Sequence, residues 1–320
     1  MILDLPVVFA VLMGAAILAY VVLDGYDLGV GMLIAGADRE EQDVMVSSIG
    51  PFWDANETWL VLGVGLLLVA FPAAHGVILG ALYLPVAAML TGIVLRGVGF
   101  ELRIKAEGWH RELWNWLFWA GSTLASFAQG LMLGRYITGF EPGFGYWLFA
   151  VLVGAALCGG YVLLGAGWLI LRTEGALQAK ALGWARWGLA WVALGVALVS
   201  LGTPLVSETV REKWFSFPRI VFLSALPLAA VASWLWVWVS LRKSEVQPFA
   251  GAVAIFVVSF LGLAYSLFPY VVIDRLTIWE AAAHPSALVF ILVGTGIVLP
   301  FILGYTFWSY RIFRGKATGG

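Results

Sequence analysis

The chain alternates between long apolar runs and short polar connections along its whole length. Each run has about 20 residues or more, enough for an α-helix to cross a hydrocarbon core of about 30 Å. The strands of membrane barrels instead alternate apolar and polar residues over about ten positions. We therefore predict an all-α integral membrane protein with nine transmembrane helices. The predicted spans are residues 7–35, 52–74, 77–103, 113–137, 145–171, 184–205, 218–240, 249–271 and 287–311.

The connections between these runs are too short to hold a soluble domain, so residues 1–320 form a single integral membrane domain. A weak internal repeat aligns YVVLDGYDLG at 20–29 with YVLLGAGWLI at 161–170. Membrane proteins often contain such repeats. We therefore expect two related four-helix bundles, at about 1–140 and 143–271, and one peripheral ninth helix at 287–311.

Composition excludes a soluble protein, because 62% of residues are hydrophobic, 12% are charged and the mean hydropathy is +0.95. The net charge of −1 and the lack of a basic tail give no sign of a nucleic-acid partner. The single cysteine, Cys158, excludes a disulfide framework. The three histidines lie near span ends or in loops, so we expect no metal site on this chain. No Lys or Arg precedes the first run, which we interpret as a retained span and not a cleaved signal peptide.

The distribution of Lys and Arg predicts the orientation, since these residues favour the cytoplasmic side of a membrane. With the N-terminus outside, twelve of the 18 Lys and Arg residues fall in inner segments and five in outer segments. The remaining one, Arg96, lies inside a span. We therefore predict a periplasmic N-terminus and a cytoplasmic C-terminus.

Acidic residues occur in pairs within the first two predicted spans. Asp24 and Asp27 are three positions apart, so they share one helix face, and Asp54 and Glu57 have the same spacing. Ionisable groups inside a bilayer cost about 2.5 kcal/mol or more each and often mark a proton or ion route. For Asp54 and Glu57 a simpler interpretation also stands, because acids near a helix N-terminus interact favourably with its dipole.

The third predicted span adds two more charges, Arg96 within the apolar run and Glu101 near its inner end. An acidic partner would lower the cost of burying Arg96, although an arginine can also snorkel to the interface without any special role. Acids on three consecutive spans, all toward the predicted inner side, resemble the entrance of a proton pathway. An ion-pair network that fixes helix packing and a cation site remain alternatives.

Four motifs resemble subunit II of the bd-type quinol oxidases, prokaryotic terminal respiratory oxidases. The motifs are LDGYDLGVGML at 23–33, GPFWDANETWL at 50–60, RGVGFELR at 96–103 and LFPYVVIDRLTIWEA at 267–281. They occur in the order and spacing of that family, and the resemblance covers essentially the whole chain. The compact loops favour the cyanide-insensitive branch.

The resemblance implies a subunit of an oxidoreductase in the bacterial inner membrane. In that family, subunit I binds haem b and haem d, or a further haem b, and oxidises quinol while dioxygen is reduced to water. Subunit II binds no haem and packs against subunit I as a heterodimer. The resemblance leaves room for a small single-span accessory subunit, membrane lipid and a structural quinone.

The resemblance also assigns roles to individual residues. Asp54 falls where the family has an acid of a proton route, and Asp24 and Asp27 match its paired acids in the first span. Glu101 matches an acid near the inner end of the third span, and Trp59 a tryptophan at the start of a proposed dioxygen path. Without the resemblance, the same residues would also fit a proton-coupled secondary transporter or a purely structural assembly subunit.

Overall fold

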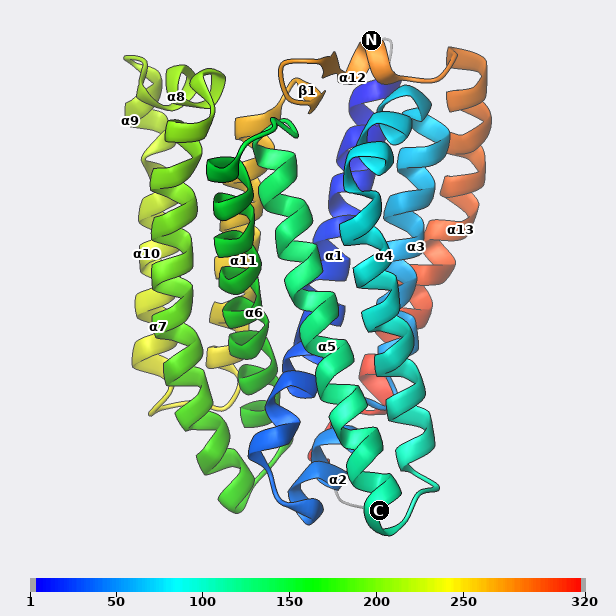
Figure 1. Ribbon diagram of the computed structural model, residues 1–320, viewed down its shortest axis with the longest axis vertical. Helices are drawn as coiled ribbons and strands as arrows, with labels where there is room; N and C mark the ends of the chain where they lie inside the picture. Colours follow the sequence, from blue (N-terminus) through cyan, green and yellow to red (C-terminus); the bar gives the residue numbers. More distant parts are fainter. Residues whose placement is uncertain (1–3, 318–320) are drawn as a thin grey trace.

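The computed structural model describes residues 4–317, which are mostly helical (Figure 1). The long helices run roughly parallel to one another, and the short elements lie at the two ends of the molecule (Figure 1). The long helices are α1 Leu5–Leu33, α3 Trp53–Ala70, α4 Pro72–Arg103, α5 Gly108–Ile137, α6 Phe144–Arg172, α7 Gly175–Val206, α10 Ala225–Ser240, α11 Gln247–Leu267 and α13 Pro285–Ile312. The short elements are η1 Ile34–Gly36, α2 Arg39–Ile49, α8 Glu208–Phe215, α9 Arg219–Leu223, α12 Ile278–Ala281, and the antiparallel strands β1 Tyr270–Val272 and β2 Leu276–Thr277.

Seven helical segments of the described part are long and apolar enough to cross a membrane. An eighth candidate arises if α2 and α3, which are bent by 50° at their junction, form one span. Helix α5 has 30 residues and corresponds to the predicted span 113–137, but it mixes apolar residues with polar ones such as His110, Asn115 and Gln129. The prediction of an all-α protein with many spans is confirmed, and the number of nine stays a prediction.

Local sequence explains where several helices begin. Asp4 caps α1 by accepting a hydrogen bond from the Val7 N–H at 3.3 Å. Asp38 and Glu41 form a capping box at the start of α2. Pro51 lies in the junction between α2 and α3, where its missing N–H and its ring are incompatible with a continuous helix. The two helices are bent by 50° at this point.

The long helices lie in two groups, with α6, α7, α10 and α11 on one side and α1, α3, α4 and α5 on the other (Figure 1). Helix α13 lies along α3 at the outer edge of the second group (Figure 1). Helices α1 and α5 pack against α6 and so join the two groups.

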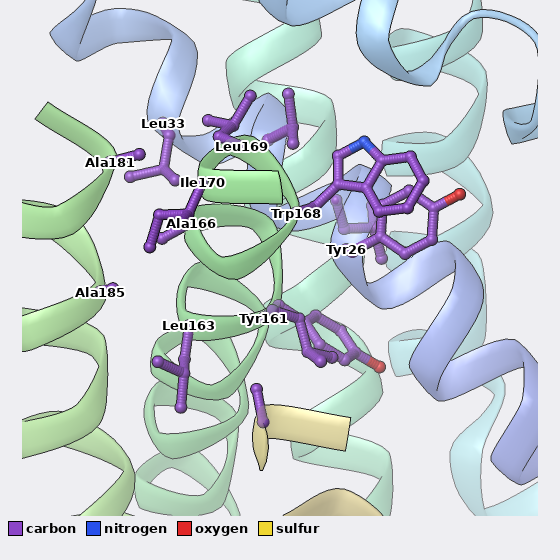
Figure 2. Packing of buried hydrophobic residues seen from close by; sticks show 14 of the residues in the cluster. Tyr26, Leu33, Tyr161, Leu163, Ala166, Trp168, Leu169, Ile170, Ala181 and Ala185 are labelled. Carbon is purple, nitrogen blue, oxygen red and sulfur yellow. The ribbon is translucent and has the colours of Figure 1, made fainter. Parts of the chain in front are cut away.

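Helices α1 and α6 approach each other closely at two glycines. A Cβ atom added to Gly29 would lie 1.9 Å from the Tyr161 carbonyl oxygen, and one added to Gly165 would lie 2.5 Å from the Gly29 carbonyl carbon. Next to this contact, Tyr26 of α1 stacks on Trp168 of α6, with ring centroids 4.2 Å apart (Figure 2). Small residues at a helix crossing permit such backbone contact.

The same two glycines reveal how the two halves of the chain correspond. They occupy equal places in LGVGMLI at 28–34 and LGAGWLI at 164–170, two segments that share five of seven residues. This register differs from the predicted alignment of 20–29 with 161–170. The close contact between Gly29 and Gly165 supports the new register, because a pseudo-symmetric crossing brings equivalent positions together.

Two glutamines show the same correspondence between the halves, because they are separated by as many positions as Gly29 and Gly165. Gln42 donates to the carbonyl oxygens of the residues eight and five positions before it, Ile34 at 3.2 Å and Ala37 at 3.0 Å. Gln178 donates in the same way to Ile170 and Thr173, at 3.0 Å each. Helix α7 starts and ends at the positions that correspond to the start of α2 and the end of α3. The bent pair α2–α3 and the uninterrupted α7 therefore occupy matching ranges of the chain at this offset.

The segment after α13 crosses from one group of helices to the other. Lys316 donates to the Thr173 carbonyl at 3.0 Å and to Glu245 at 2.6 Å, and the Ala317 N–H donates to the Arg172 carbonyl at 2.7 Å. Hydrogen bonds from Lys316 and Gln178 hold the pKa of Glu245 below its usual value. Helix α1 begins at one end of the molecule and α13 ends at the other (Figure 1).

Gly29→Ala should destabilise the protein by about 1–3 kcal/mol or more, because the new methyl group would overlap the backbone of α6. The midpoint of thermal unfolding in detergent measures the effect. Gly80→Ala is the matched control, since a Cβ atom at Gly80 meets nothing within 4 Å. An equal midpoint for both variants would contradict the importance of the crossing.

Candidate functional site

Arg96 lies at the centre of a buried ionic cluster that joins three helices. Its side chain, on α4, is 2% exposed and donates to Asp24 Oδ1 of α1 at 2.6 Å. A second nitrogen of the same guanidinium donates to Glu57 Oε1 of α3 at 3.2 Å. The ring of Trp53 lies over the guanidinium at 5.8 Å. Arg96 is therefore buried and paired with two acids.

The cluster runs from a fully buried acid to a partly exposed one. The side chain of Asp24 is 0% exposed, whereas that of Glu57 is 25% exposed. Asp54 lies one helical turn before Glu57 and is exposed on the surface of α3. The two α3 acids therefore form the outer end of the cluster, and Asp24 forms its inner end.

Asp27 is buried beside this cluster and takes its hydrogen bond from Asn56. The Asn56 side-chain amide donates to Asp27 Oδ2 at 2.7 Å and to the Tyr26 hydroxyl at 2.8 Å. The Tyr310 hydroxyl of α13 donates to Asn56 Oδ1 at 3.1 Å and lies 2.6 Å from the Tyr26 hydroxyl. Sequence reasoning missed Asn56 and Tyr310. The polar Asn56 within the second predicted span was a usable signal, but nothing in the sequence marks Tyr310.

Several buried polar atoms of the site have no hydrogen-bond partner among residues 4–317. They are Asp24 Oδ2, Asp27 Oδ1 and Arg96 Nε. Asp27, Arg96 and Trp53 line a gap that is too narrow for a water molecule. The carboxylates therefore keep free acceptor positions inside a closely packed part of the bundle.

Glu101 and Trp59 lie apart from the cluster. Glu101 is exposed near the end of α4, and no hydrogen bond or ion pair of the described residues involves it. Trp59 is 7% exposed and packs against Ala16 and Tyr20 of α1, next to apolar residues of α13. The structure thus brings together Asp24, Glu57 and Arg96, places Asp27 beside them, and leaves Glu101 on the surface.

A second polar network, which sequence reasoning missed, holds α2 against α4 and α5. Arg103 is 4% exposed and donates to Asn115 Oδ1 at 2.7 Å and to Asp43 Oδ1 at 3.0 Å. Asn115 in turn donates to Gln42 Oε1 at 2.7 Å, and Arg111 also donates to Asp43. These bonds fix α2, and through it the start of α3 with the exposed Asp54 and the partly exposed Glu57.

The other half of the chain provides an internal comparison for the acids. At the offset set by Gly29 and Gly165, Asp24 and Asp27 correspond to Gly160 and Leu163. The α3 residues Asp54, Asn56 and Glu57 correspond to Ala190, Val192 and Ala193 of α7. At these positions the corresponding helices therefore carry only small and apolar residues. Helices can thus pack without acids at such positions, and replacing buried ion pairs by apolar residues is often neutral for stability in general.

Comparisons with known proteins agree on one family. The family model described as cytochrome bd terminal oxidase subunit II matches residues 5–313. Cytochrome bd ubiquinol oxidase subunit 2 of Bacillus subtilis (strain 168) is 28% identical and the alignment covers 96% of this chain and 95% of that protein. Cytochrome bd-I ubiquinol oxidase subunit 2 of Escherichia coli (strain K12) is 27% identical, with 96% and 93% covered.

A solved structure shares the fold. A chain in the structure of bd oxidase from Geobacillus thermodenitrificans matches with a TM-score of 0.83 and 14% identity. The match covers 97% of this chain and 99% of that chain. Within residues 4–317, no group of three or more His, Cys, Asp or Glu side chains could hold a metal ion.

Arg96→Met should destabilise the protein by about 3–5 kcal/mol, because Asp24 would remain buried without its positive partner. Adding Asp24→Asn should recover most of the loss. Thermal unfolding midpoints of the two variants test this expectation. Arg39→Gln is the control, since its pair with Glu112 is 67% and 42% exposed and should contribute less than about 1 kcal/mol. A double variant no more stable than Arg96→Met would contradict the pairing.

Proposed function

Because the chain belongs to the cytochrome bd terminal oxidase subunit II family, we propose that it is the haem-free subunit II of a quinol:dioxygen oxidoreductase of the bacterial inner membrane. Its partner is a haem-bearing subunit I, with which it forms a heterodimer. The haems, b and d or a further b, are held by that partner and supply the electron chemistry of dioxygen reduction.

In this proposal the protein crosses the membrane nine times. Two four-helix bundles, α1 with α3, α4 and α5, and α6 with α7, α10 and α11, are accompanied by the peripheral α13. The start of α1 faces the periplasm and the end of α13 faces the cytoplasm. The α2 helix and the exposed acids of α3 then lie toward the cytoplasmic side, from which protons for water formation are drawn.

The observation that carries the proposal is the continuous set of acids from the surface of α3 to the interior. Asp54 is exposed, Glu57 is partly exposed, and Arg96 links Glu57 to the buried Asp24. Neighbouring ionisable groups inside a membrane protein commonly form proton relays. Asp54 and Glu57 accept protons from water, and Asp24 and Asp27 pass them inward. Glu101, on the same side, adds to the surface charge that collects protons.

The absence of these acids from the other half supports a functional role. The corresponding positions hold Gly160, Leu163, Ala190 and Ala193, so the fold tolerates apolar residues there. For Trp59 we propose a role in dioxygen access, since its ring lies in an apolar contact between α1, α3 and α13. Dioxygen is apolar and dissolves in the hydrocarbon core, and such a contact offers it a path away from charged groups.

One observation favours a second candidate, a purely structural assembly subunit. The pair of Arg96 and Asp24 joins α4 to α1, and such a bond could serve helix packing alone. In that case neutral substitutions of the acids would lower the yield of the complex and leave the turnover of each assembled complex unchanged.

Asp54→Asn should lower oxidase turnover of the assembled complex by about ten- to a hundredfold, because the amide cannot transfer a proton. Oxygen consumption with a reduced quinol measures turnover, and the optical spectrum reports the haems of the partner. Glu107→Gln removes an exposed acid outside the cluster and is the matched control.

Three results are distinguishable. Slow turnover with an intact haem spectrum supports the proton route. Loss of haem from the complex would make Asp54 a structural residue, and normal turnover would show that protons do not enter through it.

A further inference from the structure

A closed ring of hydrogen bonds connects α1, α3 and α13 beside Asp27. The Asn56 amide nitrogen donates to the Tyr26 hydroxyl at 2.8 Å, and the Tyr310 hydroxyl donates to Asn56 Oδ1 at 3.1 Å. The two hydroxyls are 2.6 Å apart, so Tyr26 completes the ring by donating to Tyr310. Every hydroxyl and the amide oxygen then has a partner, as buried polar groups require.

The ring determines which side of the Asn56 amide faces Asp27. Because Oδ1 accepts from Tyr310, the NH₂ group must point toward Tyr26 and Asp27, where it donates to Asp27 Oδ2 at 2.7 Å. An amide turned by half a rotation would present its oxygen to the carboxylate, and two acceptors repel each other. The Tyr310 hydroxyl therefore favours this orientation of the amide, together with the Leu23 carbonyl oxygen, which accepts from Asn56 Nδ2 at 3.3 Å.

Tyr310 is itself held in place by aromatic packing. Its ring stacks on Phe52 with centroids 4.6 Å apart and an interplanar angle of 25°. Phe52 also meets Phe313 edge-on at 6.1 Å. Beyond it, Lys316 fastens the chain to Thr173 and Glu245. The end of α13 that carries Tyr310 is thus fixed by contacts that do not involve the Tyr310 hydroxyl. This hydroxyl is therefore available for the ring of hydrogen bonds.

The ring has no counterpart in the other half of the chain. The position that corresponds to Asn56 is Val192, and the one that corresponds to Asp27 is Leu163. The tyrosine comes from α13, which lies beside the group formed by α1, α3, α4 and α5 (Figure 1). The ring and the buried acid therefore occur together in one half, and both are missing from the other.

We propose that Asn56 and Tyr310 are positioning residues for Asp27, and that α13 thereby takes part in the proton route. Tyr310 fixes the amide of Asn56, and Asn56 holds one carboxylate oxygen of Asp27 while the other oxygen stays free to accept a proton. The inference rests on the proposed function, in which Asp27 passes protons inward.

The test is a double-mutant cycle in the assembled complex. Tyr310→Phe keeps the ring that stacks on Phe52 and removes only the hydroxyl. We expect turnover to fall about tenfold, the factor that corresponds to losing one hydrogen bond between neutral groups, with an unchanged haem spectrum. In the Asp27→Asn background the same substitution should cause no further loss. If the two substitutions acted independently, their losses of turnover would multiply in the double variant, and this result would overturn the inference.

Two further variants complete the design. Tyr136→Phe removes a part-buried hydroxyl that donates to the Val271 carbonyl at the opposite end of the molecule, and it should leave turnover unchanged. If Tyr310→Phe does not assemble, Tyr26→Phe opens the same ring while it keeps the stack on Trp168. It should show the same lack of additivity with Asp27→Asn, and a multiplied loss would again overturn the inference.

The cycle separates failure of the inference from failure of the proposed function. Normal turnover of Asp27→Asn would refute a proton route through Asp27. Slow turnover of Asp27→Asn together with normal turnover of Tyr310→Phe would refute only the positioning role.

Discussion

The buried charge of Arg96 is the constraint on which the arrangement of α1, α3 and α4 depends. A cation inside a bilayer must be paired, and Arg96 is paired with acids from two other helices, Asp24 and Glu57. These bonds fix the rotation of α1, α3 and α4 about their axes. Once α3 is fixed, Asn56 faces α1 and meets Asp27. The polar interior is thus one connected arrangement, in which each side chain limits the positions open to the next.

The second constraint is the close contact of α1 with α6 at Gly29 and Gly165. It places two helices with similar sequences and very different side-chain chemistry next to each other. On the α6 side the equivalents of the acids are Gly160 and Leu163, and the space is filled by aromatic rings such as Phe256. The protein therefore combines a polar half and an apolar half on one shared framework, and the charged residues are an addition to that framework.

The sequence predicts the helices and the unusual charges well, because an acid or arginine in an apolar run is conspicuous. It predicts their partners less well. Glu101 is five residues after Arg96, which turns it about 140° around the helix and onto the surface. Tyr310 resembles any tyrosine near a span end, so only the fold shows its contact with Asn56. The sequence pattern aligns Tyr20 with Tyr161, whereas the backbone contact identifies Gly29 and Gly165 as equivalent positions. Close backbone packing restricts which residue can occupy a position more than the hydropathy pattern does.

The order of the network along the chain has a consequence for biogenesis. The hydroxyls of Tyr26 and Tyr310, which are in contact in the folded protein, are separated by 284 positions, and Arg96 follows Asp24 by 72. A ribosome therefore delivers α1 and its carboxylates to the membrane before Arg96 has been synthesised, and α13 follows much later. Until Arg96 enters the membrane, Asp24 lacks the cation that pairs with it in the folded protein. The ion pairs of Arg96 can form once α4 has entered the membrane, whereas the ring of Tyr26, Asn56 and Tyr310 can close only after α13 has entered.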